Sequence, residues 1–262
     1  MTSQGVYQHF RPEEHDFIDK ITRLAQRVEE TYTYVLTEFL NPRQIEIAKT
    51  VVNHFGLKAF VSSDYYASEY ARLIIAPEYY VCQVEDFELA LLEVRYQSKF
   101  AQLSHAQIMG TLLNHLGIKR TVIGDILVTD GYAQVLVSRN MSDYIRIHTT
   151  KMARTSVSLR EIPLSDIIVA NQASLQLNVI VSSMRLDKIL ATVLKLSRTQ
   201  AAQLIGTGKV KLNYQLIDKT ATVLQVGDLV SVRGFGRFSI LSDNGITKNG
   251  KLKLTIDKMI HK

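Results

Sequence analysis

Residues 185–213 read RLDKILATVLKLSRTQAAQLIGTGKVKLN. Apolar residues recur at helical spacing in the first ten positions of this segment. A second helix is predicted from Ser197, because Ser197 and Gln200 have the spacing of a capping box at a helix start. Gly206 and Gly208 end that helix, and the alternation that follows predicts a strand with two lysines on one face. The segment is therefore predicted to form two short helices followed by a strand.

Two arginines in this segment fall where anions bind. Arg185 and Arg198 are predicted in the first turns of the two helices, where unpaired backbone N–H groups and the helix dipole favour a phosphate. Arginine also presents a planar group of five donors, which binds phosphate in a bidentate manner or stacks on an unpaired base. The pattern indicates an RNA-binding surface.

The segment and its continuation resemble the S4 RNA-binding domain. The resemblance is carried by Arg185-Leu186-Asp187, Ser197-Arg198 with Ala201, Ile205, Gly208-Lys209-Val210, Asn213, Gly227-Asp228 and Arg233. Tyr214 stands where that family commonly has glycine, and Asn213, which tolerates positive φ, is expected to help the turn. The resemblance implies a C-terminal S4-type (αL) RNA-binding domain over residues 182–262, reading the shape and backbone of RNA more than its sequence. The predicted RNA contacts are Arg185, Lys188, Ser197, Arg198, Thr199, Lys209, Lys211, Asn213, Arg233 and Arg237.

Charge is distributed unevenly along the 262 residues, although the net charge of +6 is modest. Residues 1–150 carry 14 basic and 18 acidic side chains, whereas residues 151–262 carry 17 basic and 7 acidic ones. An acidic body followed by a basic C-terminal third predicts a polyanionic partner held at one end.

The rest of the chain predicts an α+β protein with two further domains. Residues 1–79 predict a small N-terminal α/β domain, with helices at 13–30 and 43–55 followed by strands at 57–61 and 72–76. Residues 80–165 predict a strand-helix-strand-strand-helix-strand order, with Asp130-Gly131 as a hairpin turn. This βαββαβ order predicts a ferredoxin-like domain. Residues 166–181 predict a linker that contains a strand.

The same βαββαβ order occurs in the RNA-recognition-motif fold, but the aromatic signature of that fold is absent from the central strands. A group of basic residues slightly favours contact with phosphates, with an ordinary charged surface as the equal alternative. These residues are Lys119, Arg120, Arg139, Arg146, Lys151, Arg154 and Arg160. The central domain is therefore predicted to be an RNA-binding platform, or only a spacer.

Several classes of protein are excluded by what the sequence lacks. Cys82 is the single cysteine, so no intrachain disulfide and no multi-cysteine zinc site can form. No apolar run approaches the ~20 residues of a membrane span, and residues 1–12 lack the pattern of a signal peptide. We therefore expect a cytoplasmic protein with no membrane partner. Catalytic motifs are missing, so we expect no enzyme, no catalytic residue, no cofactor and no metal.

The whole arrangement resembles the YlmH family of bacterial RNA-binding proteins. That resemblance implies a non-catalytic, ribosome-associated factor that recognises structured RNA, ribosomal RNA or transfer RNA, on stalled or dissociated large ribosomal subunits. The alternative is a protein-interaction adaptor linked to bacterial cell division. In that case the acidic N-terminal segment would be the functional surface.

Overall fold

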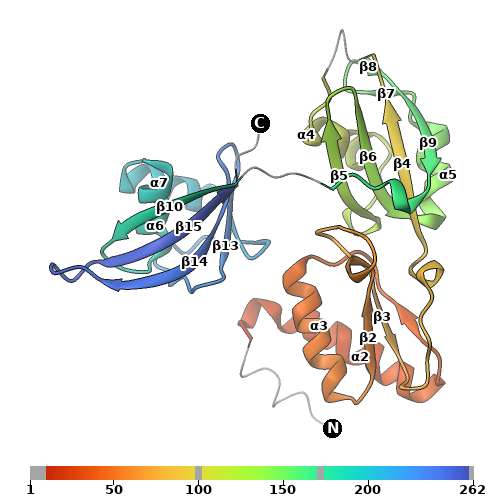
Figure 1. Cartoon of the computed structure of the whole chain (residues 1–262), viewed down its shortest axis with the longest axis horizontal. Coiled ribbons are helices and arrows are strands. Elements are labelled where there is room, and N and C mark those ends of the chain that lie inside the picture. Colours follow the sequence, from red (N-terminus) through yellow and green to blue (C-terminus); the bar gives the residue numbers. More distant parts are fainter. Residues whose placement is uncertain (1–9, 98–101, 170–173, 260–262) are drawn as a thin grey trace. The chain divides into compact units, whose positions relative to one another are not determined.

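The computed structural model describes residues 10–97, 102–169 and 174–259. The chain forms two compact bodies, Met1–Ala170 and Asn171–Lys262, each of which is described by itself (Figure 1). Both mix helices with antiparallel sheets, so the α+β class is confirmed. Residues 1–9, where no signal peptide is expected, and residues 170–173 of the predicted linker lie outside the described ranges.

The first body begins with two helices that cover a small sheet. Helix α2 (His15–Thr31) follows a 3-10 turn, η1 (Pro12–Glu14), and α3 (Pro42–His54) begins at a capping box between Asn41 and Gln44. Proline at the start of η1 and α3 suits a helix N-terminus, where its missing N–H removes no bond. The sheet has the order β1-β3-β2, with β1 (Val35–Leu36), β2 (Lys58–Val61) and β3 (Leu73–Ala76). Both predicted helices and both predicted strands are confirmed.

The second half of this body has the predicted βαββαβ order, which is compatible with a ferredoxin-like sandwich. Its elements are β4 (Leu89–Arg95), α4 (His105–Gly110) with the wider turn η4 (Thr111–His115), β5 (Ile123–Thr129), β6 (Tyr132–Ser138), α5 (Arg139–His148) and β9 (Ser158–Ile162). A small hairpin of β7 (Lys151–Met152) and β8 (Thr155–Ser156) precedes β9. The sheet order is β5-β6-β4-β9, so β6 and β4 are the central strands. Short 3-10 turns η2 (Ser62–Asp64), η3 (Val84–Phe87), η5 (Arg120–Val122) and η6 (Leu164–Asp166) connect these elements.

One face of this second sheet packs against its own helices, and part of the other face packs against the N-terminal half. Ala90, Leu92 and Val94 of β4 point into the core with α4 and α5. The alternate residues Leu91 and Leu136 join a second core, which includes Phe39 and Ile74 of the N-terminal half. Such alternation is the two-residue period of a strand buried on both faces. The two halves therefore share one hydrophobic core.

A substitution at Gly124 of β5 tests the packing of this shared core. A Cβ atom at position 124 would lie 2.7 Å from Cε1 of the buried Phe39, whose backbone N–H also donates to Thr121 O at 2.9 Å. Overpacking of this kind destabilises by roughly 1–3 kcal/mol, so we expect Gly124→Ala to lower the midpoint of thermal unfolding of this body by several degrees. Gly110→Ala is the control, because its Cβ would meet nothing closer than 3.9 Å. Equal midpoints for the two variants would contradict the packing described.

The second body is a six-stranded antiparallel sheet with two helices on one face. Its strand order is β10-β15-β14-β13-β11-β12. The strands are β10 (Ser174–Val181), β11 (Val210–Leu212), β12 (Gln215–Leu216), β13 (Leu229–Val232), β14 (Gly236–Ile246) and β15 (Leu252–Met259). The strand predicted within the linker is β10, which pairs with β15 along its whole length. Helices α6 (Leu186–Leu194) and α7 (Arg198–Gly206) pack their apolar faces on this sheet.

No helix within the described ranges is both long enough and apolar enough to span a bilayer.

Candidate nucleic-acid interface

A buried carboxylate joins the starts of the two C-terminal helices. Asp187, in the first turn of α6, has a side chain only 3% exposed. It accepts hydrogen bonds from Arg185 Nε at 3.0 Å and Nη2 at 3.1 Å, and from Arg198 Nε at 2.9 Å. Arg185 is the N-cap residue of α6, and Arg198 is the first residue of α7. Asp187 therefore holds both of the arginines that were predicted at the two helix starts.

The ion pairs keep Asp187 charged although it is buried. The hydrogen bond from Arg185 lowers the pKa of Asp187 most, burial opposes that shift, and the bond from Arg198 lowers the pKa further. The guanidinium groups remain partly in solvent, with the Arg185 side chain 34% exposed and the Arg198 side chain 62% exposed. Each guanidinium retains donors beyond those that Asp187 accepts. The arrangement presents two oriented arginines at the surface.

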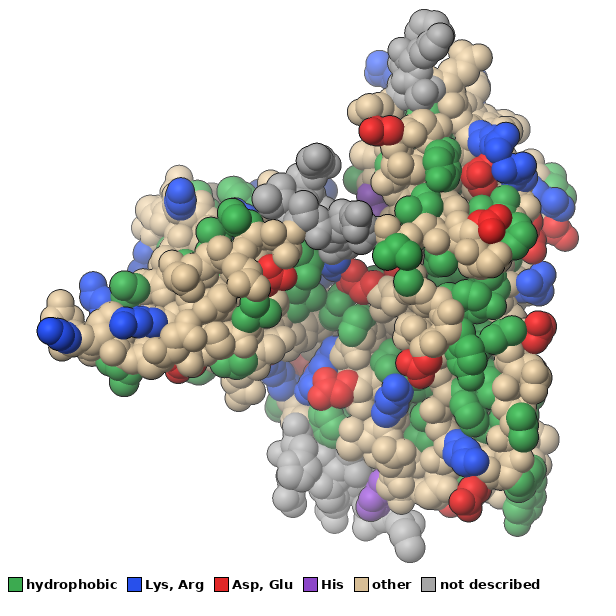
Figure 2. Space-filling model, in the orientation of Figure 1, with side chains coloured by type: hydrophobic (Ala, Val, Ile, Leu, Met, Phe, Trp, Pro, Cys, Tyr) green, Lys and Arg blue, Asp and Glu red, His purple; other side chains and the backbone are tan. Residues whose placement is uncertain are grey.

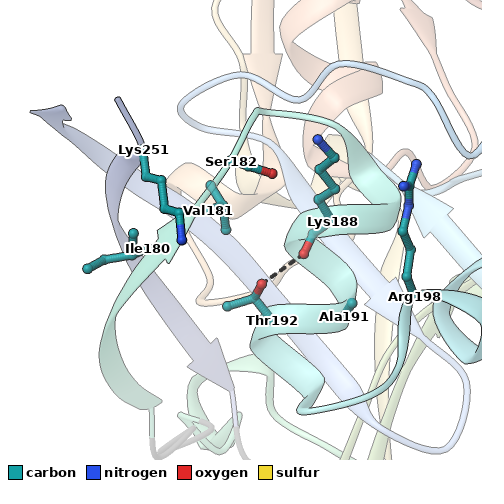
Figure 3. A pocket seen from close by; sticks show the side chains of 8 residues that line it. All are labelled: Ile180, Val181, Ser182, Lys188, Ala191, Thr192, Arg198 and Lys251. Atoms are coloured by element: carbon teal, nitrogen blue, oxygen red, sulfur yellow. Dashed lines mark hydrogen bonds between the residues drawn. The ribbon is translucent and has the colours of Figure 1, made fainter. Parts of the chain in front are cut away.

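An open pocket of about 480 Å³ lies next to Arg198 (Figure 3). Three cations line it from three separate elements, namely Lys188 of α6, Arg198 of α7 and Lys251 just before β15. The other lining residues are small, aliphatic or hydroxylated: Ile180, Val181, Ser182, Ala191 and Thr192. None of the lining residues is acidic, so the pocket suits a phosphate group.

Lys251 is a candidate contact that the sequence analysis missed. It lies in the turn of the long hairpin between β14 and β15, where Thr247 N–H donates to Lys251 O at 2.7 Å and Gly250 has φ +73°. Figure 2 shows Lys and Arg side chains at the protruding end of this hairpin. The signal was present in Asn249-Gly250, a strong hairpin turn pair, with lysines at positions 248, 251 and 253.

The N-terminus of α7 contributes backbone donors as well as Arg198. Ser197 caps the helix by accepting from Gln200 N–H at 3.2 Å, and Gln200 Oε1 accepts from Ser197 N–H at 2.9 Å, as the predicted capping box requires. The hydroxyl of Ser197 thus serves its own helix. Thr199 is exposed in the first turn, where backbone N–H groups remain available to an anion.

The remaining predicted contacts belong to the sheet rather than to the pocket. Lys211 pairs with Ser231, which pairs with Arg237, so these three residues share the sheet face turned away from the helices. Lys209 and Arg233 are exposed neighbours, since Arg233 N–H donates to Lys209 O at 2.9 Å. The structure therefore divides the predicted set into a group at the helix starts and a group on the sheet.

Asn213 stabilises the turn after β11, and its side chain is engaged within the protein. Its amide donates to Asp228 Oδ1 at 2.7 Å, and its carbonyl oxygen accepts from Leu229 N–H at 2.9 Å. Asn213 and Tyr214 both have positive φ, +47° and +71°, in the two-residue turn between β11 and β12. The expected left-handed Asn213 is confirmed, and its side chain ties this turn to β13.

Four of the seven basic residues noted in the central domain contact other side chains of the protein. Arg120 stacks on the Tyr70 ring at 4.2 Å, Arg139 pairs with Glu161 at 3.2 Å, and Arg146 pairs with Asp143 at 2.7 Å. Arg160 is held by Glu93 on a different face of the sheet. Four of the seven residues therefore make contacts within the protein, and the RNA-binding platform stays a prediction.

No group of three metal-ligating side chains occurs in the part of the chain that the structure describes.

Comparisons with known proteins place these features in a family. Residues 13–80 match the family described as "YlmH, N-terminal", residues 82–166 match "Putative RNA-binding domain in YlmH", and residues 184–230 match "S4 domain". The chain is 35% identical to "Ribosome-associated protein quality control protein P2" of Bacillus subtilis (strain 168) over 254 residues, 97% of this chain and 98% of that protein. A solved structure, "Cell division protein ylmH from Streptococcus pneumoniae", is 37% identical with a TM-score of 0.57 and covers 62% of this chain and 99% of that one.

Proposed function

This chain belongs to the YlmH family, and from that premise we propose that it is a non-catalytic factor that binds structured RNA on the ribosome. The S4 domain is the RNA-binding part. Its targets are ribosomal RNA and transfer RNA on the large subunit, when that subunit is stalled or dissociated.

The pocket between α6, α7 and the β14–β15 hairpin carries this proposal. Three cations and no carboxylate line it, and the buried Asp187 accepts a hydrogen bond from Arg198, whose side chain stays largely in solvent. Phosphate binding by such a group depends on the position of the charges and not on base identity. This suits a protein that recognises a folded RNA by the course of its backbone.

The similarity to the Bacillus subtilis protein is the reason for proposing the ribosome as the place of action. The Bacillus subtilis protein is named for ribosome-associated quality control, and the two proteins match over nearly their full lengths. A factor of that kind works in the cytoplasm, where its RNA partners are. The cell-division name of the Streptococcus pneumoniae structure supports no separate function by itself.

Crosslinking of the tagged protein in living cells, followed by sequencing of the attached RNA, tests the proposal. We expect reads concentrated on large-subunit ribosomal RNA and on transfer RNA, and we expect the Lys188→Ala/Arg198→Ala/Lys251→Ala variant to lose that enrichment. Reads spread thinly over all transcripts would overturn the proposal. They would favour the alternative, a protein-interaction adaptor whose acidic N-terminal surface binds the division machinery.

A further inference from the structure

The sheet of β4, β5, β6 and β9 has a face that its own helices do not cover. Strand pairing arranges the residues of this face in rows across the sheet. The first row contains Leu91, Leu136 and Ile162, which pack in the core shared with the N-terminal half. This end of the face is therefore covered by residues of the N-terminal half.

The second row is polar on three strands and has Leu127 on the fourth, β5. It contains Gln134, Glu93 and Arg160, on three neighbouring strands. Gln134 is buried, donates to Asp166 O at 2.8 Å and accepts from Ile168 N–H at 2.8 Å, so the segment after β9 crosses the sheet here. Beyond this crossing the described residues of this body leave the face exposed, as Arg95 and Arg160 show.

Glu93 orients two arginines at the open end. It accepts from Arg160 Nε at 2.8 Å and Nη2 at 3.3 Å, and from Arg95 Nε. The bond from Arg160 lowers the pKa of Glu93 most, burial opposes that shift, and the bond from Arg95 lowers it further, so the carboxylate stays charged. The Arg95 and Arg160 side chains are 56% and 55% exposed, and their donors exceed what one carboxylate can accept. Figure 2 shows Lys and Arg side chains gathered beside β4 and β9.

The third row places an aromatic ring beside these cations. Thr129, Tyr132, Arg95 and Ser158 are paired in that order across all four strands. Tyr132 is 36% exposed and lies directly opposite Arg95 on a central strand, where paired side chains are about 5 Å apart. The neighbours Thr129 and Ser158 are small. Tyr132 is a single exposed ring at the start of β6 and does not make up the aromatic signature that the central strands lack.

We propose that this open end of the sheet binds a single-stranded segment of RNA, with one unpaired base stacked on Tyr132 and the flanking phosphates on Arg95 and Arg160. A planar ring and two planar guanidinium groups offer stacking surfaces to any base, and the two cations exceed the one carboxylate between them. Duplex RNA does not expose base faces, so the site selects unpaired nucleotides. The site shares no residue with the C-terminal pocket and does not depend on the function proposed for that pocket.

The test measures binding of a fluorescently labelled, unstructured twelve-nucleotide RNA, (CA)₆, to the full chain by anisotropy. All variants are made in the Lys188→Ala/Arg198→Ala/Lys251→Ala background, which removes the C-terminal pocket from the measurement. We expect Tyr132→Ala to weaken binding about ten-fold or more, since stacking one base on an aromatic ring has that effect. Tyr132→Phe keeps the ring and should bind within about two-fold of the background protein.

Two further variants make the result specific. Arg95→Gln should weaken binding and reduce its dependence on salt, while Arg160 remains to pair with Glu93. Tyr144→Ala is the matched control, because Tyr144 is an exposed tyrosine of the same body on α5. Equal affinities of Tyr132→Ala and Tyr144→Ala, or no binding of (CA)₆ by the background protein, would overturn the proposal. Neither result would bear on the C-terminal pocket, which is tested with folded RNA.

Discussion

Replacing Lys188, Arg198 and Lys251 together with alanine is expected to weaken binding of bulk transfer RNA about 100-fold at moderate salt. Each residue contributes one charged contact at the pocket between α6, α7 and the hairpin. Loss of a contact of this type weakens binding by roughly 1 kcal/mol or more, and three such losses correspond to about two orders of magnitude. Arg198→Ala alone should account for about 1–3 kcal/mol of the loss, because its guanidinium can contact either phosphate or base.

The salt dependence of transfer RNA binding shows whether the three residues contact phosphates or act only through the protein's net charge. Each phosphate contact contributes roughly 0.7–0.9 to the slope of log affinity against log salt concentration, so the triple variant should have a slope smaller by about 2–3. A charge-matched control replaces Lys20, Lys49 and Lys58 of the first body with alanine. If the two triple variants lose affinity and slope equally, the pocket has no particular role.

Asp187→Asn is expected to destabilise the second body and to weaken RNA binding at the same time. The asparagine has the same shape, but it lacks the charge that pairs with Arg185 and Arg198. Loss of hydrogen bonds to a charged group reduces the free energy of unfolding by about 1–3 kcal/mol, and the exposure of both arginines places the effect toward the lower end. Hydrogen exchange of the β11 and β13 amides reports the stability of this body.

The direction in which Asp187→Asn changes RNA affinity distinguishes an effect of guanidinium orientation from an effect of the protein's net charge. Asp187→Asn makes the protein more positive by one unit, so a general electrostatic effect would tighten RNA binding. Loss of the fixed guanidinium positions would weaken it instead, and this is the result we expect. Tighter binding would show that Asp187 does not position the arginines for RNA. Asp218→Asn, on an exposed loop, is the control for the charge change.

The stability difference between wild type and Asp187→Asn should also depend on pH. The pKa of Asp187 is lowered in the folded protein, so the unfolded chain takes up the proton first as the pH falls. The stabilisation is therefore complete above the ordinary aspartate pKa of about 4 and is lost as the pH falls through the lowered value. Unfolding experiments at pH 7 and at about pH 3 should show the full difference in the free energy of unfolding between the two proteins at the first pH. The difference should be smaller at the second pH. An unchanged difference would contradict the ion pairs.

Local sequence signals predicted most of the secondary structure. The capping box predicted at Ser197 is formed, and the structure has further boxes at Asn41 and Ser104. Such signals act over three or four residues, so they can be recognised without the tertiary structure. The end of α4 carries no such local signal: α4 ends at Gly110 and the chain continues in the wider turn η4, with Leu116 N–H donating to Thr111 O at 3.2 Å.

The sequence by itself determined the α+β class, the order of the elements and the arginines at the starts of α6 and α7, because each depends on residues close together in the chain. Only the tertiary structure decided which cations act together. Lys251 is 53 residues from Arg198, yet both line one pocket. Tyr132 and Arg95 become neighbours only through the pairing of β6 with β4. Contacts of this kind follow from sheet register and core packing between distant segments, and no local spacing in the sequence encodes them.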